Sequence, residues 1–210
     1  SEGQGLYAGV FVVRQASALD IVVQKVIEVF GDNIHDGDAF MTSDPWYGAL
    51  HAMDAAVVMP VFHEGVRVAW TGVVVHELDM GGARPGSWCV GARDAYQEVP
   101  LMPPVKIVEA GHVRHDVEVT FLRNSRTPEM NALNLRAKIA SQKMTGDRLR
   151  EIIDEYGRDT FLAVQQQILD YVERSIRQRL SELPDGTWYA NAFLDHDGLA
   201  NRLYRLRLAL

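Results

Sequence analysis

The sequence predicts a mixed α/β (α+β) fold, with a β-rich first half, a helical layer and a final β segment. Short apolar runs, some alternating and some continuous, dominate the chain as far as about residue 115. From about 116 to 183, apolar residues recur every three to four positions, which is the period of an α-helix. Turn residues then introduce two further strand-like runs within 184–210.

Strands alternate with a single helix in the predicted first half. We expect LYAGVFVV (6–13) to be a strand and 17–31 to be a helix, since Ser17 suits the N-cap and Gly31 the position after the C-terminus. Because AAVV and VVV are continuous rather than alternating, at least two strands should be buried on both faces. The further strands are expected at 38–43, 55–62 and 66–75, with His63-Glu64-Gly65 as a tight turn, and 105–114 is expected to form a strand and a turn.

The second half is predicted to be helical almost to Leu183. Helices are expected at 129–157 and 159–183, separated by Gly157. Pro184-Asp185-Gly186 is a turn, and strands follow at 187–198 and 202–210. Between the halves, the Gly- and Pro-rich stretch 80–104 is predicted to be a long ordered loop of the kind that carries function.

The composition argues against a nucleic-acid-binding or membrane protein and limits which atoms could bind a metal. The 210 residues are 47% apolar, and the formal net charge of −7 argues against a nucleic-acid surface. No apolar run is long enough to cross a membrane and no secretory leader is present, so we expect a cytoplasmic protein. Cys89 is the single cysteine and is expected to be a buried thiol rather than a nucleophile. Any metal would therefore be bound by nitrogen and oxygen.

Two histidines and an aspartate are placed to converge. His51 and Asp54 precede the strand 55–62, and His76 follows the strand 66–75. If these strands form an antiparallel hairpin, the start of one and the end of the other are neighbours. Two imidazoles and a carboxylate suit zinc, manganese or iron, with positions left for water or substrate. A turn or a helix N-cap is the alternative reading of His51 and Asp54.

Other polar and aromatic residues are weaker candidates for function. Asp79 is expected to orient the His76 imidazole, and Asp44 either assists or caps its own turn. His196, within DHDG, is a second candidate ligand, whereas His63, His112 and His115 are expected at the surface. The aromatic residues Trp46, Tyr47 and Trp88 are expected in the core, with the walls of an apolar substrate pocket as the alternative.

Several motifs in order resemble the hydantoinase B/5-oxoprolinase family. They are GDNIHDGDAFMTSDPWYGALHAMDAAVVMPVF, VVVHELDMGGARPGSWC, DAYQEVPLMPPVKIVE and NSRTPEMNALNLRAKIA. Hydrolases of the family read NDPYxGGTHxPD, AHHADIGG and GDLxAQ. The versions SDPWYGALHAMD, VHELDMGG and LNLRAK found here resemble more closely the α subunits of acetone and acetophenone carboxylases.

The resemblance implies a subunit of an ATP-dependent ketone carboxylase. ATP would bind a separate hydantoinase A-like partner, and further carboxylase subunits, a ketone and bicarbonate would complete the system. Family metal ligands fall on His51, Asp54 and His76, and a further acidic ligand would precede Ser1. The chain 1–210 would be one segment of a larger subunit, with the metal-site region at about 1–115.

Two alternatives to the carboxylase stay open. One is an ATP-dependent hydrolase of a cyclic amide such as a hydantoin, 5-oxoproline or a lactam, in which the same metal would position water. The other is a non-catalytic scaffold segment that has lost its metal.

Overall fold

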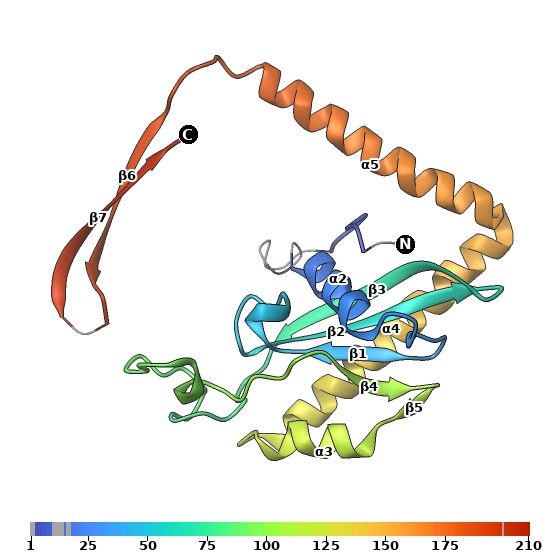
Figure 1. Cartoon of the computed structure of the whole chain (residues 1–210), viewed down its shortest axis with the longest axis horizontal. Helices are drawn as coiled ribbons and strands as arrows, with labels where there is room; N and C mark the ends of the chain where they lie inside the picture. Colours follow the sequence, from blue (N-terminus) through green and yellow to red (C-terminus); the bar gives the residue numbers. More distant parts are fainter. Residues whose placement is uncertain (1–2, 10–14, 16–17, 199) are drawn as a thin grey trace.

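The structure, a computed structural model, describes residues 3–9, 15, 18–198 and 200–210. In this part of the chain the main sheet is antiparallel and has the strand order β3–β2–β1–β4–β5 (Figure 1). Its strands are β1 (Ala39–Thr42), β2 (Asp54–His63), β3 (Val66–His76), β4 (Val105–Glu109) and β5 (His112–Val113). The helices are α2 (Leu19–Phe30), α3 (His115–Arg123), α4 (Pro128–Tyr156) and α5 (Arg158–Ser181). A second sheet pairs β6 (Tyr189–His196) with β7 (Asn201–Ala209). The mixed α/β fold is confirmed.

The long hairpin β2–β3 forms around the predicted turn. Glu64 has φ 50° and Gly65 has φ 76°. Two successive positive φ angles are typical of the type I′ turn, whose twist matches that of the flanking strands. The resulting register pairs Asp54, the first residue of β2, with His76, the last residue of β3.

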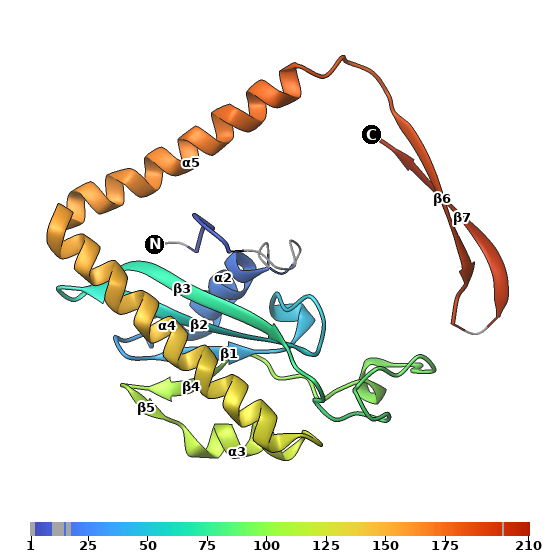
Figure 2. The ribbon, with the colours of Figure 1, turned by 180° about the vertical axis from the view of Figure 1, so that it is seen from behind.

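Different helices pack against the two faces of the main sheet. Ala56 and Val58 of β2 belong to the apolar cluster with α2, whereas Ala55 and Val57 belong to the cluster with α3 and α4. Figures 1 and 2 show α2 and α4 on opposite sides of the sheet. Because side chains alternate along a strand, Asp54 lies on the α2 face.

The two long helices are divided at Gly157, as predicted. This residue has φ 86° and separates α4 from α5, a conformation that glycine adopts without steric cost. Near that junction Phe161 packs against a small cluster that contains Val61 and Ile153. The rest of α5 leaves the body of the molecule, and no residue of it is buried (Figure 1).

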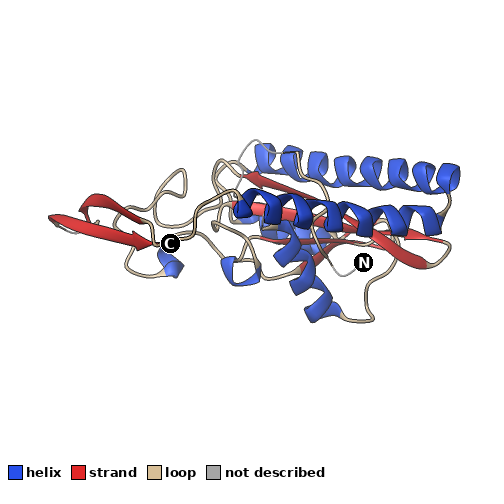
Figure 3. Ribbon diagram, turned by 90° about the horizontal axis from the view of Figure 1, so that it is seen from above, coloured by secondary structure: helices blue, strands red, loops and turns tan. Residues whose placement is uncertain are grey.

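The β6–β7 hairpin lies beyond the main sheet (Figure 3). Its register places six mostly apolar side chains on one face: Ala190, Ala192, Leu194, Tyr204, Leu206 and Leu208. Apart from the half-buried Tyr204, these side chains are exposed in the described structure. An isolated two-stranded hairpin is marginally stable in water, so this face is one that a partner surface would stabilise.

The start of the chain and the strand β3 either differ from the expected pattern or lie outside the described residues. Residues 6–9 of the expected first strand have no regular secondary structure, and residues 10–13 and Ser17 lie outside the described residues. The run 73–75 is half-buried because β3 is an edge strand, whereas the central β1 is buried along its whole length. The second doubly covered strand is therefore β1, next to β2.

Candidate functional site

His51, Asp54 and His76 lie together at one rim of the main sheet. One nitrogen or oxygen from each of the three side chains can be chosen so that all of them lie within 4.8 Å of one another. Asp54 and His76 meet because they are directly opposite each other in the β2–β3 register. His51 reaches the same place through a tight turn, in which its carbonyl accepts a 2.8 Å hydrogen bond from the Asp54 N–H.

The Asp54 carboxylate is the buried centre of this cluster. Its Oδ1 lies 2.8 Å from Nδ1 of His76, and it also accepts a 3.0 Å hydrogen bond from the Gln15 side chain. The Asp54 side chain is 5% exposed, whereas that of His76 is 51% exposed. Because Nδ1 of His76 and Oδ1 of Asp54 are 2.8 Å apart, these are the two atoms close enough to contact the same ion. The cluster is thus anchored from inside and open to solvent from outside.

An aromatic stack covers one side of the cluster. The His51 ring lies 5.4 Å from the His76 ring and 5.9 Å from the Trp88 ring, at interplanar angles of 29° and 26°. The Met53 N–H donates a 3.3 Å hydrogen bond to Nδ1 of His51. Trp88 is 68% exposed, so it belongs to the surroundings of the cluster and not to the core. This position fits the alternative reading of Trp88 as a pocket wall.

The loop that carries Trp88 is anchored through Asp79. Its carboxylate accepts hydrogen bonds from the N–H groups of Gly81 and Gly86, at 2.7 and 2.8 Å, and from Arg126. Burial would raise the pKa of Asp79, but these hydrogen bonds together hold it below the ordinary value. Asp54, rather than Asp79 as expected, contacts the His76 ring.

A buried ion pair lies on the opposite face of the sheet from the cluster. Nζ of Lys138 in α4 is 2.5 Å from Oε1 of Glu77, and the two side chains are 2% and 0% exposed. The second carboxylate oxygen accepts a 2.8 Å hydrogen bond from Asn134. Burial lowers the pKa of Lys138, and the charge of Glu77 opposes this effect. We did not predict this network, although polar residues at four-residue spacing, 134, 138 and 142, are a signal of it.

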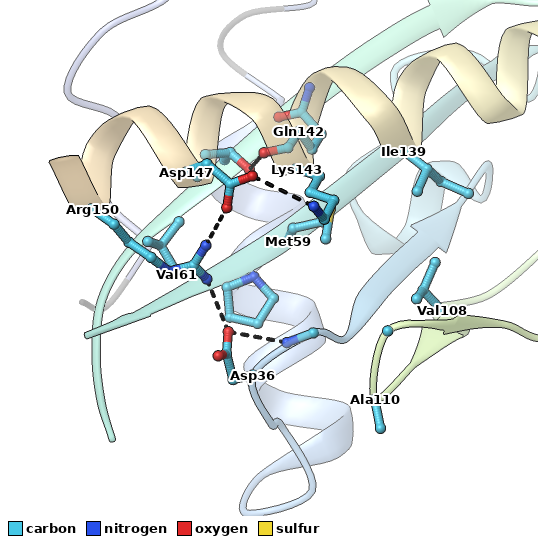
Figure 4. A pocket seen from close by; sticks show the side chains of 15 residues that line it. Asp36, Met59, Val61, Val108, Ala110, Ile139, Gln142, Lys143, Asp147 and Arg150 are labelled. Carbon is cyan, nitrogen blue, oxygen red and sulfur yellow. Dashed lines mark hydrogen bonds and ion pairs between the residues drawn. The ribbon is translucent and has the colours of Figure 1, made fainter. Parts of the chain in front are cut away.

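The cavity drawn in Figure 4 is separate from the histidine cluster. It has a volume of about 310 Å³ and lies between α4 and the far end of β2. The Arg150 guanidinium on its wall donates hydrogen bonds of 2.8 Å to Asp147 and 2.9 Å to Asp36 (Figure 4). Since these charges are paired with one another, they do not indicate an anion or cation site.

The remaining sequence candidates lie apart from the cluster or have local roles. Asp44 accepts a 2.9 Å hydrogen bond from the Trp46 N–H and so caps its own turn. Trp46 is 84% exposed, which contradicts a place in the core. Nε2 of His63 lies 2.9 Å from Asp154. The other candidates are exposed or half-buried: Tyr47, Cys89, His112, His115 and His196.

Two solved structures share this fold. The ATP-dependent caprolactamase of Pseudomonas jessenii matches with a TM-score of 0.79 and 32% identity over 85% of this chain. A nucleotide-free acetone carboxylase matches with a TM-score of 0.79 over 92% of the chain, and at 20% identity this likeness concerns the fold alone. The model of the hydantoinase B/oxoprolinase family matches residues 2–210, and the chain belongs to this family.

Among curated relatives, the acetophenone carboxylase delta subunit of Aromatoleum aromaticum is 32% identical over 88% of the chain. The chain spans 27% of that relative, 31% of the caprolactamase chain and 27% of the acetone carboxylase chain. No helix in the described part of the chain is long and apolar enough to cross a membrane.

Proposed function

We propose that His51, Asp54 and His76 bind a divalent metal ion, with manganese, zinc or iron as the candidates. The observation that carries the proposal is the convergence of two imidazoles and a carboxylate within 4.8 Å at a solvent-accessible rim. Nitrogen and oxygen donors of this kind suit these three metals.

The reaction that we propose is ATP-dependent carboxylation of a ketone. A metal at this site would act as a Lewis acid on an oxygen that gains negative charge. Bicarbonate, the ketone or both would be activated by phosphorylation in a hydantoinase A-like partner subunit. The α-carbon of the ketone would lose a proton to solvent and form the new bond to the carboxyl carbon, while the bond to the activating phosphate breaks and inorganic phosphate leaves. The similarity to the acetophenone carboxylase delta subunit supports this choice.

The residues around the cluster have separable roles in this proposal. Oδ1 of Asp54 and Nδ1 of His76 lie 2.8 Å apart and would bind the ion side by side. Trp88 provides a flat apolar surface beside His51, against which an aromatic or aliphatic ketone would pack. The anchored loop around Asp79 restricts how far Trp88 moves.

ATP-dependent hydrolysis of a cyclic amide is the second candidate function. The caprolactamase relative, at 32% identity, favours it specifically. The same three side chains would then bind the metal, and the attacking nucleophile would be water. Incubation of the purified complex with ATP, substrate and labelled bicarbonate separates the two reactions, because carboxylation incorporates the label and hydrolysis does not.

Elemental analysis of the purified complex tests the metal site itself. We expect close to one equivalent of metal in the parent protein and its loss in His51→Ala. His112→Ala is the matched control, because that histidine lies on the exposed β5. A parent protein without metal, or one in which His51→Ala retains it, would exclude the metal site and favour a scaffold role.

A further inference from the structure

Successive residues at the end of β3 face in opposite directions. His76 lies on the α2 face with Asp54, whereas Glu77 lies against α4 and is fully buried. This follows from the alternation of side chains along extended backbone. The buried Glu77 carboxylate is therefore attached, through a single peptide unit, to a residue of the candidate metal site.

The Glu77–Lys138 pair joins three parts of the structure at this rim. Besides its contact with Glu77, Nζ of Lys138 donates a 3.2 Å hydrogen bond to the carbonyl of Ala55, which follows Asp54. The Glu77 N–H donates a 2.9 Å hydrogen bond to the carbonyl of Met53, which precedes Asp54. One network thus holds the backbone on both sides of Asp54 and the residue after His76.

The free energy of folding does not by itself account for such a pair. Removing two charges from water is unfavourable, and replacing a buried ion pair with apolar residues of similar volume is often neutral or stabilising. The pair does provide directional contacts of 2.5 to 3.2 Å, which an apolar core lacks. Directional contacts fix the position of the backbone, and metal affinity depends on that position.

We propose that the Glu77–Lys138 ion pair is a positioning device that sets the placement of Asp54 and His76 for metal binding. This inference rests on the proposed metal site. Lys138 and Glu77 would touch neither the metal nor the substrate, and they would act through the backbone of residues 53–55 and 76–77.

The test compares two double variants of the full complex with the parent. Glu77→Leu/Lys138→Met replaces the pair with apolar side chains, whereas Asp38→Asn/Lys106→Met removes a second buried pair, whose charged atoms are 2.9 Å apart. Manganese or zinc affinity is measured by competition with a chelating dye, and unfolding by calorimetry. We expect the first variant to unfold within a few degrees of the parent but to bind metal about 10–100-fold more weakly. The control should keep the parent affinity.

If Glu77→Leu/Lys138→Met binds metal as tightly as the parent and is equally stable, the inference is overturned. Glu77→Gln is the conservative variant: it keeps an oxygen acceptor and should lose less affinity than the double variant.

A second readout is independent of metal. Hydrogen–deuterium exchange of peptides covering 51–57 and 74–79 should be faster in Glu77→Leu/Lys138→Met, and unchanged exchange there would also overturn the inference. A parent complex that binds no metal would refute the proposed function, and faster exchange of these peptides in Glu77→Leu/Lys138→Met would then show only that the ion pair positions the backbone.

Discussion

Asp54 and His76 are directly opposite each other at the open end of the β2–β3 hairpin, with Oδ1 and Nδ1 2.8 Å apart. Their separation of 22 residues in the sequence is bridged by two strands and one tight turn. A rigid hairpin therefore supplies two of the three candidate ligands, and the turn 51–54 supplies the third.

The first prediction concerns the buried carboxylate of this pair. Asp54→Asn keeps the shape of the side chain but removes its negative charge, so we expect metal affinity to fall at least 10-fold. Isothermal titration with Mn²⁺ or Zn²⁺ measures the change. Asp44→Asn is the control, since that carboxylate caps a turn nearby. Equal affinities of Asp54→Asn and the parent would contradict a metal site at this rim.

The second prediction compares the exposed tryptophans Trp46 and Trp88. Trp88 stacks on His51. Metal bound beside His51 should quench or shift the fluorescence of Trp88. We expect this signal to disappear in Trp88→Phe and to persist in Trp46→Phe. The prediction fails if the metal-dependent signal survives in Trp88→Phe.

The third prediction concerns backbone packing in the loop. Gly82 and Gly86 both have positive φ, at 82° and 75°, but a Cβ on Gly82 would overlap the carbonyl oxygen of Glu98, whereas one on Gly86 would meet open space. Gly86→Ala should therefore cost about 1–2 kcal/mol of conformational strain, and Gly82→Ala distinctly more. Calorimetric unfolding and limited proteolysis of the loop measure both. Similar losses in the two variants would show that the close approach to Glu98 is unimportant.

The fourth prediction concerns pH. Burial would raise the pKa of Asp38, but hydrogen bonds from Ala110 and His35 and the contact with Lys106 hold it below the ordinary value. A lowered pKa in the folded state contributes stability above the unfolded-state pKa, about 3.9, and this contribution is lost as pH falls through the lower folded-state value.

Thermal unfolding between pH 3 and pH 7 tests this effect. Asp38→Asn should lower the melting temperature at pH 7 more than at pH 3, because the charged form of Asp38 is the one that the fold stabilises. Asp36→Asn is the control, since its side chain is 62% exposed. A constant difference between Asp38→Asn and the parent across this range would contradict the prediction.

Elements with strong local signals could be predicted from the sequence. The β2–β3 hairpin followed from two apolar runs around Gly65, and the helix break from Gly157. The proximity of His51, Asp54 and His76 followed from the hairpin register. Family membership, which several motifs in order indicated, is also confirmed.

Features that depend on tertiary packing could not be predicted in the same way. Glu77 has the appearance of a surface residue in the sequence, and its burial depends on Lys138, 61 positions away. The spacing of three residues predicts a contact between Asp79 and His76, but the chain turns at Gly81 and the Asp79 carboxylate contacts Arg126 instead. Gln15 contacts Asp54 from the segment before α2, which no sequence spacing indicated.

The opposite orientations of His76 and Glu77 also limit which insertions and deletions the gene tolerates. Loss of a single codon within β3 would shift the pairing by one residue, placing the acidic side chain of Glu77 at the solvent-facing rim and the apolar side chain of Leu78 against the Lys138 ammonium group. Codon changes at the turn around Gly65 leave that end of the strand in register. Length variation among descendants of this sequence should therefore concentrate at the hairpin tip.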